Sequence, residues 1–128
     1  TMCGVPVDLG TVDMPAYILA AREDHIVPWR TAYASTALLG GPLQFVLAAS
    51  GHIAGVINPP AAGKRNHWVR PDNTPEAEAW LEGAESRPGS WWPHWAQWLA
   101  GHAGNQVPAP SSAGNSRHAA GEAAPGRY

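Results

Sequence analysis

The sequence predicts an α/β fold built around a parallel strand–helix–strand unit and completed by tryptophan-rich helices. Two apolar runs of strand length, 15–21 and 43–48, flank a helical pattern, and three tryptophans recur at helical spacing near the end of the chain. Strand, helix and strand together occupy about 35 residues, as in a βαβ unit with parallel strands. Because two strands are too few to close a core, we expect an incomplete domain.

The first helix is expected between the two apolar runs, from Trp29 to Leu39. Pro28 suits the first helical turn, and the pair Gly40-Gly41 ends the pattern. After the second run, the prolines and glycine of 58–63 break any regular element. We therefore expect a loop that continues through 64–68.

Two shorter helices are expected in the second half, over 75–82 and 91–100, capped by Thr74 and Ser90 respectively. The second of them carries tryptophans on one face, at i, i+4 and i+7. We expect this face to pack on the rest of the fold, and an exposed platform for a polymer or lipid is the alternative. These residues are Trp91, Trp95 and Trp98.

The chain divides into a folded part and a tail. We expect residues 1–100 to be the carboxy-terminal portion of a catalytic domain. Gly, Ala, Ser and Pro supply 18 of the 28 residues from 101 to 128, so we expect that segment to be disordered.

Composition indicates a soluble globular protein. A net charge of −2 and 45% hydrophobic residues argue against a nucleic-acid binder. The single cysteine, Cys3, excludes an internal disulfide. The longest apolar run is far below the ~20 residues of a membrane span, and no secretory pattern is present at Thr1. We therefore expect a cytosolic fragment without a transmembrane segment.

An acidic residue and a histidine follow the two predicted strands. Asp24 comes just after the first strand and His52 just after the second. Groups at the carboxyl ends of parallel strands meet at one edge of a sheet, so both side chains fit a shared site. Acid and then base, after an earlier nucleophile, is the chain order of the α/β-hydrolase fold. Asp24 and His52 are therefore candidate catalytic residues, with the carboxylate holding the imidazole that accepts protons.

The neighbouring residues offer less specific interpretations. Asp24 could instead cap the helix that begins near Pro28, and His52 could be an ordinary loop residue. Glu23 is a weaker candidate for the acid. His25 is expected to have a supporting or surface role, because successive residues in an extended loop point apart.

The sequence lacks a recognisable nucleophile. A nucleophile elbow needs a Gly-x-Ser/Cys-x-Gly turn between a strand and a helix, and Cys3, Ser35 and Ser50 lie outside that pattern. We expect the nucleophile upstream of Thr1 and the chain alone to be inactive. A metal site is not expected, because five of the histidines contain no pair at i, i+3 or i, i+4. These are His25, His52, His67, His94 and His102.

Four longer strings are more specific than the spacing of Asp24 and His52. They are residues 3–9 (CGVPVDL), 22–29 (REDHIVPW), 50–60 (SGHIAGVINPP) and 89–93 (GSWWP). Together they resemble the carboxy-terminal part of class I poly(3-hydroxyalkanoate) synthases, also called poly-β-hydroxybutyrate polymerases. The resemblance extends over nearly the whole chain.

This resemblance implies an α/β-hydrolase-type catalytic domain. It would transfer (R)-3-hydroxyacyl groups from coenzyme A to a growing polyester through a thioester on a cysteine. The triad acid and base of the family match Asp24 and His52. The nucleophile belongs to a Gly-x-Cys-x-Gly elbow upstream, and Cys3 matches a different family cysteine.

The resemblance also implies partners. They are the (R)-3-hydroxyacyl-CoA substrate, the polyester chain, the surface of a polyester granule in the cytoplasm and, for the full-length enzyme, a second copy in a homodimer. No cofactor is implied beyond the CoA thioester that is consumed. The alternatives are a thioesterase, esterase or depolymerase of the same fold, or a granule-binding or dimerisation module that uses the Trp-rich helix.

Overall fold

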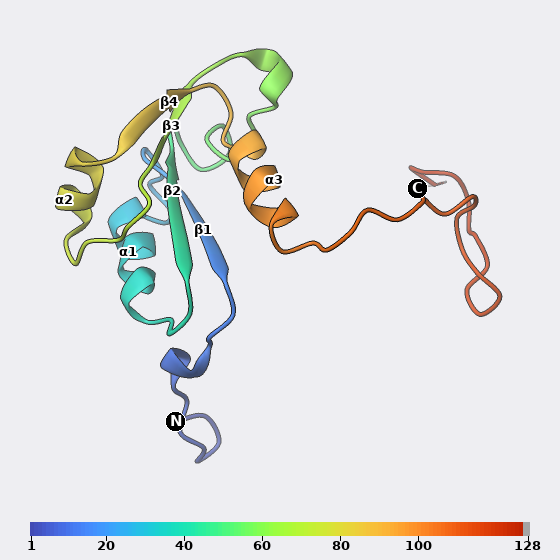
Figure 1. Ribbon diagram of the computed structural model, residues 1–128, viewed down its shortest axis with the longest axis horizontal. Helices are drawn as coiled ribbons and strands as arrows, with labels where there is room; N and C mark the ends of the chain where they lie inside the picture. Colours follow the sequence, from blue (N-terminus) through green and yellow to red (C-terminus); the bar gives the residue numbers. More distant parts are fainter. Residues whose placement is uncertain (127–128) are drawn as a thin grey trace.

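The computed structural model describes residues 1–126 and contains one four-stranded sheet with helices on both faces (Figure 1). The strands lie in the order β1-β2-β3-β4. β1 and β2 pair in parallel, from Ala16 opposite Leu43 to Ala21 opposite Ala48, whereas β3 and β4 are antiparallel to their neighbours. The predicted parallel unit and the mixed α/β class are confirmed. The strands are β1 (Ala16–Ala21), β2 (Leu43–Ala48), β3 (Asn66–Val69) and β4 (Glu85–Pro88).

Within residues 1–126, three α-helices cover the two faces of the sheet. They are α1 (Trp29–Ala34), α2 (Ala77–Glu82) and α3 (Trp92–Ala100). Single 3₁₀ turns lie before β1 (Leu9–Thr11), between α1 and β2 (Ser35–Ala37) and between β2 and β3 (Pro60–Ala62).

The expected loop over 58–68 is wrong at its end, because Asn66–Val69 forms strand β3. The prolines and glycine interrupt the chain only as far as Gly63. Beyond them, His67 pairs with Ala48 and Val69 pairs with Val46, and both side chains are buried. A four-residue strand of this kind is defined by its partners in the sheet, and its own sequence gives little signal.

The second missed strand, β4, completes the sheet on its outer side. All four of its residues are exposed, and within residues 1–126 its one strand partner is β3. An exposed strand without an apolar face lacks the alternation by which strands are recognised in a sequence.

The predicted helix from Trp29 to Leu39 is shorter in the structure. α1 ends at Ala34 and continues as a single 3₁₀ turn before the chain turns toward β2. Gly40 and Gly41 follow the end of the helical segment and also pack closely against the chain before β1. Their amides donate to the Val12 carbonyl over 3.1 and 3.0 Å, and a Cβ on Gly40 would lie 2.1 Å from the carbonyl oxygen of Gly10.

The two later helices begin one or two residues later than predicted. α2 begins at Ala77 rather than Pro75, because the Thr74 hydroxyl donates to the carbonyl of Glu76 instead of capping the helix. α3 begins at Trp92, and here the Ser90 hydroxyl does accept the Trp92 amide over 3.1 Å.

An aromatic core fills the space between the sheet and helices α1 and α2. Phe45 is fully buried, with ring centroids 4.9 Å from both Tyr33 of α1 and Trp80 of α2, in edge-to-face arrangements. Ala20 and Leu47 extend the cluster along β1 and β2. The core therefore fixes the parallel strands whose carboxyl ends carry Asp24 and His52.

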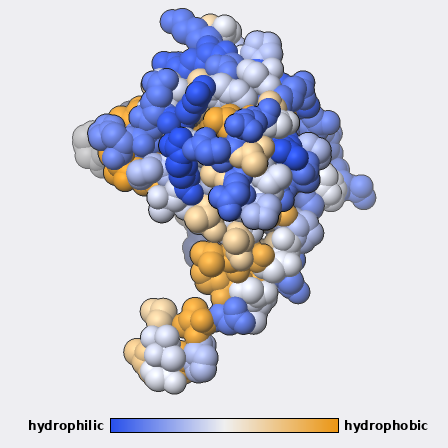
Figure 2. All heavy atoms as spheres, turned by 90° about the vertical axis from the view of Figure 1, so that its left-hand side faces the viewer, coloured by the Kyte–Doolittle hydropathy of each residue, from blue (hydrophilic) through white to orange (hydrophobic). Residues whose placement is uncertain are grey.

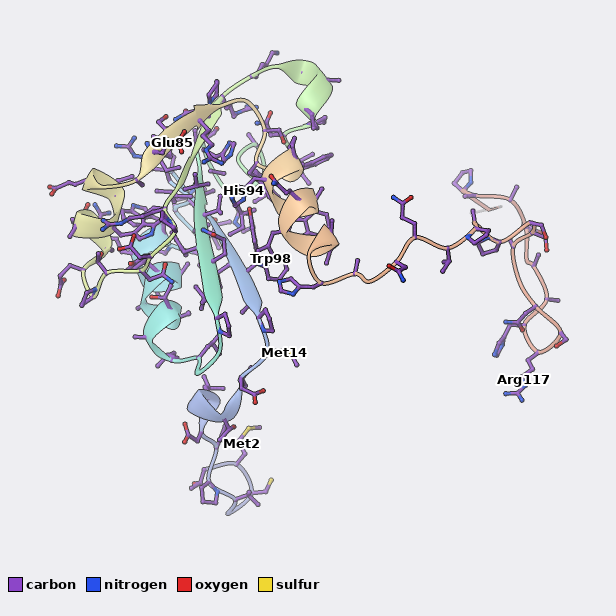
Figure 3. All side chains as sticks on the ribbon, viewed as in Figure 1. Met2, Met14, Glu85, His94, Trp98 and Arg117 are labelled. Carbon is purple, nitrogen blue, oxygen red and sulfur yellow. The ribbon has the colours of Figure 1, made fainter. Side chains whose placement is uncertain are left out.

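Helix α3 covers the opposite face of the sheet through Tyr17 of β1. The Tyr17 ring lies 6.3 Å from Trp91 and 5.4 Å from Trp98, and its hydroxyl is 2.9 Å from Nδ1 of His94. His94 and Trp98 extend from α3 toward the strands in Figure 3. The expected packing is confirmed for Trp91 and Trp98, whereas Trp95 remains 40% exposed.

The two ends of the described chain extend away from this body. Residues 103–126 contain no helix or strand and run outward beyond α3 (Figure 1). The side that carries α1 and α2 is largely hydrophilic, and hydrophobic residues gather toward the N-terminal segment (Figure 2), where Met2 and Val5 are exposed. Among residues 1–126, every helix is too short or too polar to traverse a bilayer.

Candidate active site

The loops that follow β1 and β2 lie against each other at one edge of the sheet. Backbone hydrogen bonds continue past the strand ends, from the Arg22 amide to the Ala48 carbonyl (2.8 Å) and from the Glu23 amide to the Ser50 carbonyl (3.0 Å). The two loops are therefore fixed relative to each other by their backbones, before any side chain is considered.

Asp24 is held by its own loop. Its Oδ1 accepts the backbone amides of Ile26 (2.8 Å) and Val27 (3.0 Å), which leaves Oδ2 directed at His52. The side chain is 8% exposed. The Val27 amide is the main cause that lowers the pKa of Asp24 to about 2, with further contributions from His52 and the Ile26 amide against the opposing effect of desolvation. The carboxylate is therefore charged at neutral pH.

His52 completes the pair, because its Nδ1 lies 2.7 Å from Oδ2 of Asp24. An ionised carboxylate can only accept, so Nδ1 carries the proton in this contact. In the neutral ring, the lone pair then lies on Nε2. Nε2 has no hydrogen-bond partner within residues 1–126, and the side chain is 46% exposed. The geometry is that of an oriented general base.

Two alternatives were open from the sequence, Asp24 as a helix cap and His52 as an ordinary loop residue, and neither matches this geometry. Pro28 is the N-cap residue of α1, and no side chain caps that helix. Asp24 therefore organises its own loop rather than α1, and His52 is bound to it rather than free. Glu23 and His25 are exposed and lie outside the pair.

The loop that carries His52 contains contacts that the sequence analysis missed. The carbonyl of Val56 accepts the indole N–H groups of Trp92 (3.0 Å) and Trp91 (3.2 Å). Gly55 is buried in the turn, where an added Cβ would lie 2.8 Å from the carbonyl oxygen of Ala49. Of these contacts, the sequence indicated only the tight turn at Gly55, because a glycine after His52 permits a close approach of the backbone.

Neither Cys3 nor Ser50, which carry nucleophilic side chains, is hydrogen-bonded to Asp24 or His52 within the described residues. Cys3 is exposed in a turn closed by Met2 and Val5. This N-terminal segment, marked by Met2 in Figure 3, lies at the end of the sheet opposite the carboxyl ends of β1 and β2. Ser50 lies at the end of β2 with φ at 77°, and its side chain makes no hydrogen bond within the described chain.

His67 and His94 pack against other parts of the fold, and within residues 1–126 neither is hydrogen-bonded to an acidic side chain as His52 is. His67 is buried and its Nδ1 lies 3.2 Å from the carbonyl of Gly89, while burial lowers the pKa of both His67 and His94. Within residues 1–126, no three His, Cys, Asp or Glu side chains are grouped as metal ligands.

Comparison with characterised proteins gives consistent matches. The poly(3-hydroxyalkanoate) polymerase subunit PhaC of Cupriavidus necator is 62% identical over 129 residues, which is 100% of this chain and 22% of that protein. Poly(3-hydroxyalkanoate) polymerase 1 of Ectopseudomonas oleovorans is 44% identical over 99% of this chain and 23% of its own length. The PhaC subunit of Rhizobium etli is 44% identical over 98% of this chain and 20% of its own length. The chain thus spans about a fifth of these relatives, and no protein-family model matches it.

Proposed function

The chain belongs to the poly(3-hydroxyalkanoate) polymerase family, and we propose that it supplies the acid and the base of the polymerase active site. The observation that carries this proposal is the 2.7 Å contact between Nδ1 of His52 and the carboxylate of Asp24. The substrate would be an (R)-3-hydroxyacyl-CoA, and the product a polyester lengthened by one unit with release of coenzyme A.

In the first half-reaction, Nε2 of His52 accepts the proton of a cysteine thiol. The thiolate attacks the carbonyl carbon of the acyl-CoA thioester, and the carbon–sulfur bond to coenzyme A breaks. The imidazolium then gives its proton to the departing CoA thiolate. Asp24 stabilises the imidazolium through Nδ1 in the interval.

In the second half-reaction, His52 accepts a proton from a hydroxyl group of the acceptor. The hydroxyl oxygen attacks the enzyme thioester, an ester bond forms, and the cysteine sulfur leaves and recovers the proton. One histidine therefore serves both steps, as a base and then as an acid in each of them.

The nucleophile is proposed to lie in the part of the polymerase outside this segment. Cys3 is an unsuitable candidate because it is exposed on the N-terminal turn, away from the loop of His52. The oxyanion-hole donors, which include the amide after the nucleophile, would come from the same part. The segment by itself is accordingly proposed to be inactive.

A hydrolase with the same acid and base would use water in place of the hydroxyl acceptor. The relatives compared above are all named as polymerases, so this alternative is not favoured.

We also propose that the sheet is part of a larger, α/β-hydrolase-type sheet. The parallel pairing of β1 with β2 supports this assignment, as does the order of Asp24 before His52 at the carboxyl ends of these strands. Residues 1–100 would belong to this catalytic domain, and 101–126 would be a disordered tail. The last two residues of the predicted tail, 127–128, lie outside the described residues.

The proposal extends to partners and location. A polymerase with this activity would be cytoplasmic and bound to the surface of its polyester granule, and the full-length enzyme would form a homodimer. The family membership of the segment supports these assignments.

The experiment that tests the proposed function is His52→Ala in the full-length polymerase. Release of coenzyme A from (R)-3-hydroxybutyryl-CoA, measured with a thiol reagent, is expected to fall by about 10³-fold or more, because the base for both half-reactions is lost. The matched control is His25→Ala, which removes an exposed imidazole from the loop of Asp24 and is expected to leave turnover near its original value. Near-normal turnover of His52→Ala would contradict the proposal.

A further inference from the structure

The carbonyl group of Val56 is the anchor of the loop that carries His52. It accepts two indole N–H groups, from Trp92 over 3.0 Å and from Trp91 over 3.2 Å, and so uses both of its lone pairs. The two donors come from the start of α3, about 35 residues further along the chain.

Backbone hydrogen bonds close the loop between His52 and Val56 into a compact turn, so a shift of Val56 would also shift His52. The Gly55 amide donates to Gly51 and the Ile57 amide to Ile53, both over 2.8 Å. Gly55 is also packed so closely that an added Cβ would lie 2.9 Å from the Cβ of Ala21, at the end of β1. A turn closed in this way moves as a unit, so fixing Val56 fixes His52.

The donors themselves are held in place. The Ser90 hydroxyl accepts the amide of Trp92, and the ring of Trp91 packs 6.3 Å from Tyr17 of β1. Because β1 leads directly into the loop of Asp24, α3 is fixed relative to both members of the catalytic pair. Figure 3 shows this helix lying beside β1, with His94 and Trp98 directed at the sheet.

We propose that Trp91 and Trp92 are positioning residues for His52, holding the imidazole at hydrogen-bond distance from Asp24 through the Val56 carbonyl. The inference rests on the proposed function, because it gives these residues a role in the work of His52. Within residues 1–126, neither indole makes a hydrogen bond or ring contact with the imidazole, and the connection between them runs through the backbone of the loop. A displacement of about 1 Å at a catalytic group can cost about 10²-fold in rate, so small movements of this loop matter.

The test is the double substitution Trp91→Phe with Trp92→Phe in the full-length polymerase. Phenylalanine keeps an aromatic ring in each place but removes the N–H donor together with the five-membered ring of the indole, and the Trp95→Phe control undergoes the same loss of ring volume. We expect kcat for coenzyme A release from (R)-3-hydroxybutyryl-CoA to fall about tenfold with KM changed less than about twofold, because the base is misplaced and substrate binding is unaffected. Each single substitution is expected to give a smaller fall.

Trp95→Phe is the matched control. Trp95 lies on the same helix and packs against Trp91, with ring centroids 6.2 Å apart. Its indole N–H makes no hydrogen bond among the residues that the structure describes. The same chemical change at this position is expected to leave kcat within about twofold.

A second measurement reports on His52 directly. The Nδ1 proton between His52 and Asp24 is expected to give a low-field proton resonance in the polymerase and in Trp95→Phe. The resonance is expected to weaken or shift upfield in the double variant, because the 2.7 Å hydrogen bond becomes longer. A purely structural role for the tryptophans would lower the melting temperature and leave this resonance unchanged.

The outcomes separate the inference from the proposed function. If the folded double variant has an unchanged kcat, or only a raised KM, the inference is overturned. If His52→Ala is inactive at the same time, the proposed polymerase function of the segment still stands. If the double variant does not fold, Trp92→Phe decides by itself, since it removes the shorter bond, and unchanged kcat and resonance there would overturn the inference. Full activity of His52→Ala would instead overturn the proposed function.

Discussion

Asp24 uses its two carboxylate oxygens for different tasks. Oδ1 accepts the amides of Ile26 and Val27 and shapes the loop, while Oδ2 accepts Nδ1–H of His52 and orients the ring. The same amides keep the carboxyl ionised, since its pKa is lowered to about 2. One side chain therefore both shapes its loop and orients the imidazole of His52.

This division predicts the effect of Asp24→Asn in the full-length polymerase. An asparagine can still offer its Oδ1 to the two loop amides, so the fold is expected to be retained. Its amide group would donate to His52 and favour the wrong tautomer, and turnover is expected to fall by about 10⁴-fold, the scale of the same change in a protease triad. Coenzyme A release measures the rate, and circular dichroism reports the fold.

The acid dependence of stability provides the control for this substitution. The folded pKa of Asp24 lies below its ordinary value of 3.8, so its charged interactions stabilise the fold fully above about pH 4 and are lost as pH falls toward 2. The difference in urea-unfolding free energy between the original protein and Asp24→Asn should therefore not decrease as pH falls to about 4, and it should shrink below that pH. A difference that begins to shrink at neutral pH would contradict the assignment.

The sequence identified the residues of this site because each follows an apolar run that forms a strand. The strand ends place Asp24 and His52 at one edge, as expected from parallel pairing. The sequence did not indicate which backbone amides Asp24 would bind, because that depends on the φ and ψ angles of residues 25–27.

At the scale of elements, Tyr33 joins α1 to the segment that precedes α2. Its hydroxyl donates to the Thr74 carbonyl over 2.6 Å and accepts the Thr74 amide over 3.0 Å. Its ring packs edge-to-face on Phe45. One side chain thus satisfies two backbone groups and fills the core below β2.

Tyr33→Phe is therefore expected to lower the free energy of unfolding by about 1–3 kcal/mol, because a backbone donor and acceptor lose their partner. Urea unfolding of the polymerase that carries the change measures this loss. Tyr17→Phe is the comparison, since it removes a single contact to the side chain of His94 and should cost less. Equal midpoints for Tyr33→Phe and the original protein would exclude this role of the hydroxyl.

The strands of the first half were predicted more closely than those of the second. β2 has its predicted bounds and β1 differs by one residue, because both are continuous apolar runs. β3 and β4 depend on pairing with residues about 20 positions away, and local periodicity does not report such pairing.

At the scale of the whole molecule, the two edges of the sheet differ in character. β4 carries Glu85, Arg87 and Pro88, and charge and proline are features that protect a free edge. β1 consists of apolar residues and tyrosine, and it has one strand partner within residues 1–126. An edge of this composition is typical of a strand that pairs on both sides.

We therefore expect β1 to have a second strand partner in the full-length polymerase. All amides of residues 16–21 should then exchange slowly with solvent deuterium, measured by mass spectrometry of overlapping peptides. β4 is the internal control, because amides on its outer side should exchange quickly. Fast exchange at alternate residues of β1 would show that this strand remains an edge.

The sequence by itself determined the α/β class, the two parallel strands and the placement of Asp24 and His52 at one edge of the sheet, because apolar runs and the residues that follow them are local features. The tertiary structure alone decided the two antiparallel strands, the two amides that hold Asp24 and the attachment of the His52 loop to the indoles of α3. These features depend on groups brought together by folding, and their geometry exists only once the sheet and its covering helices are assembled.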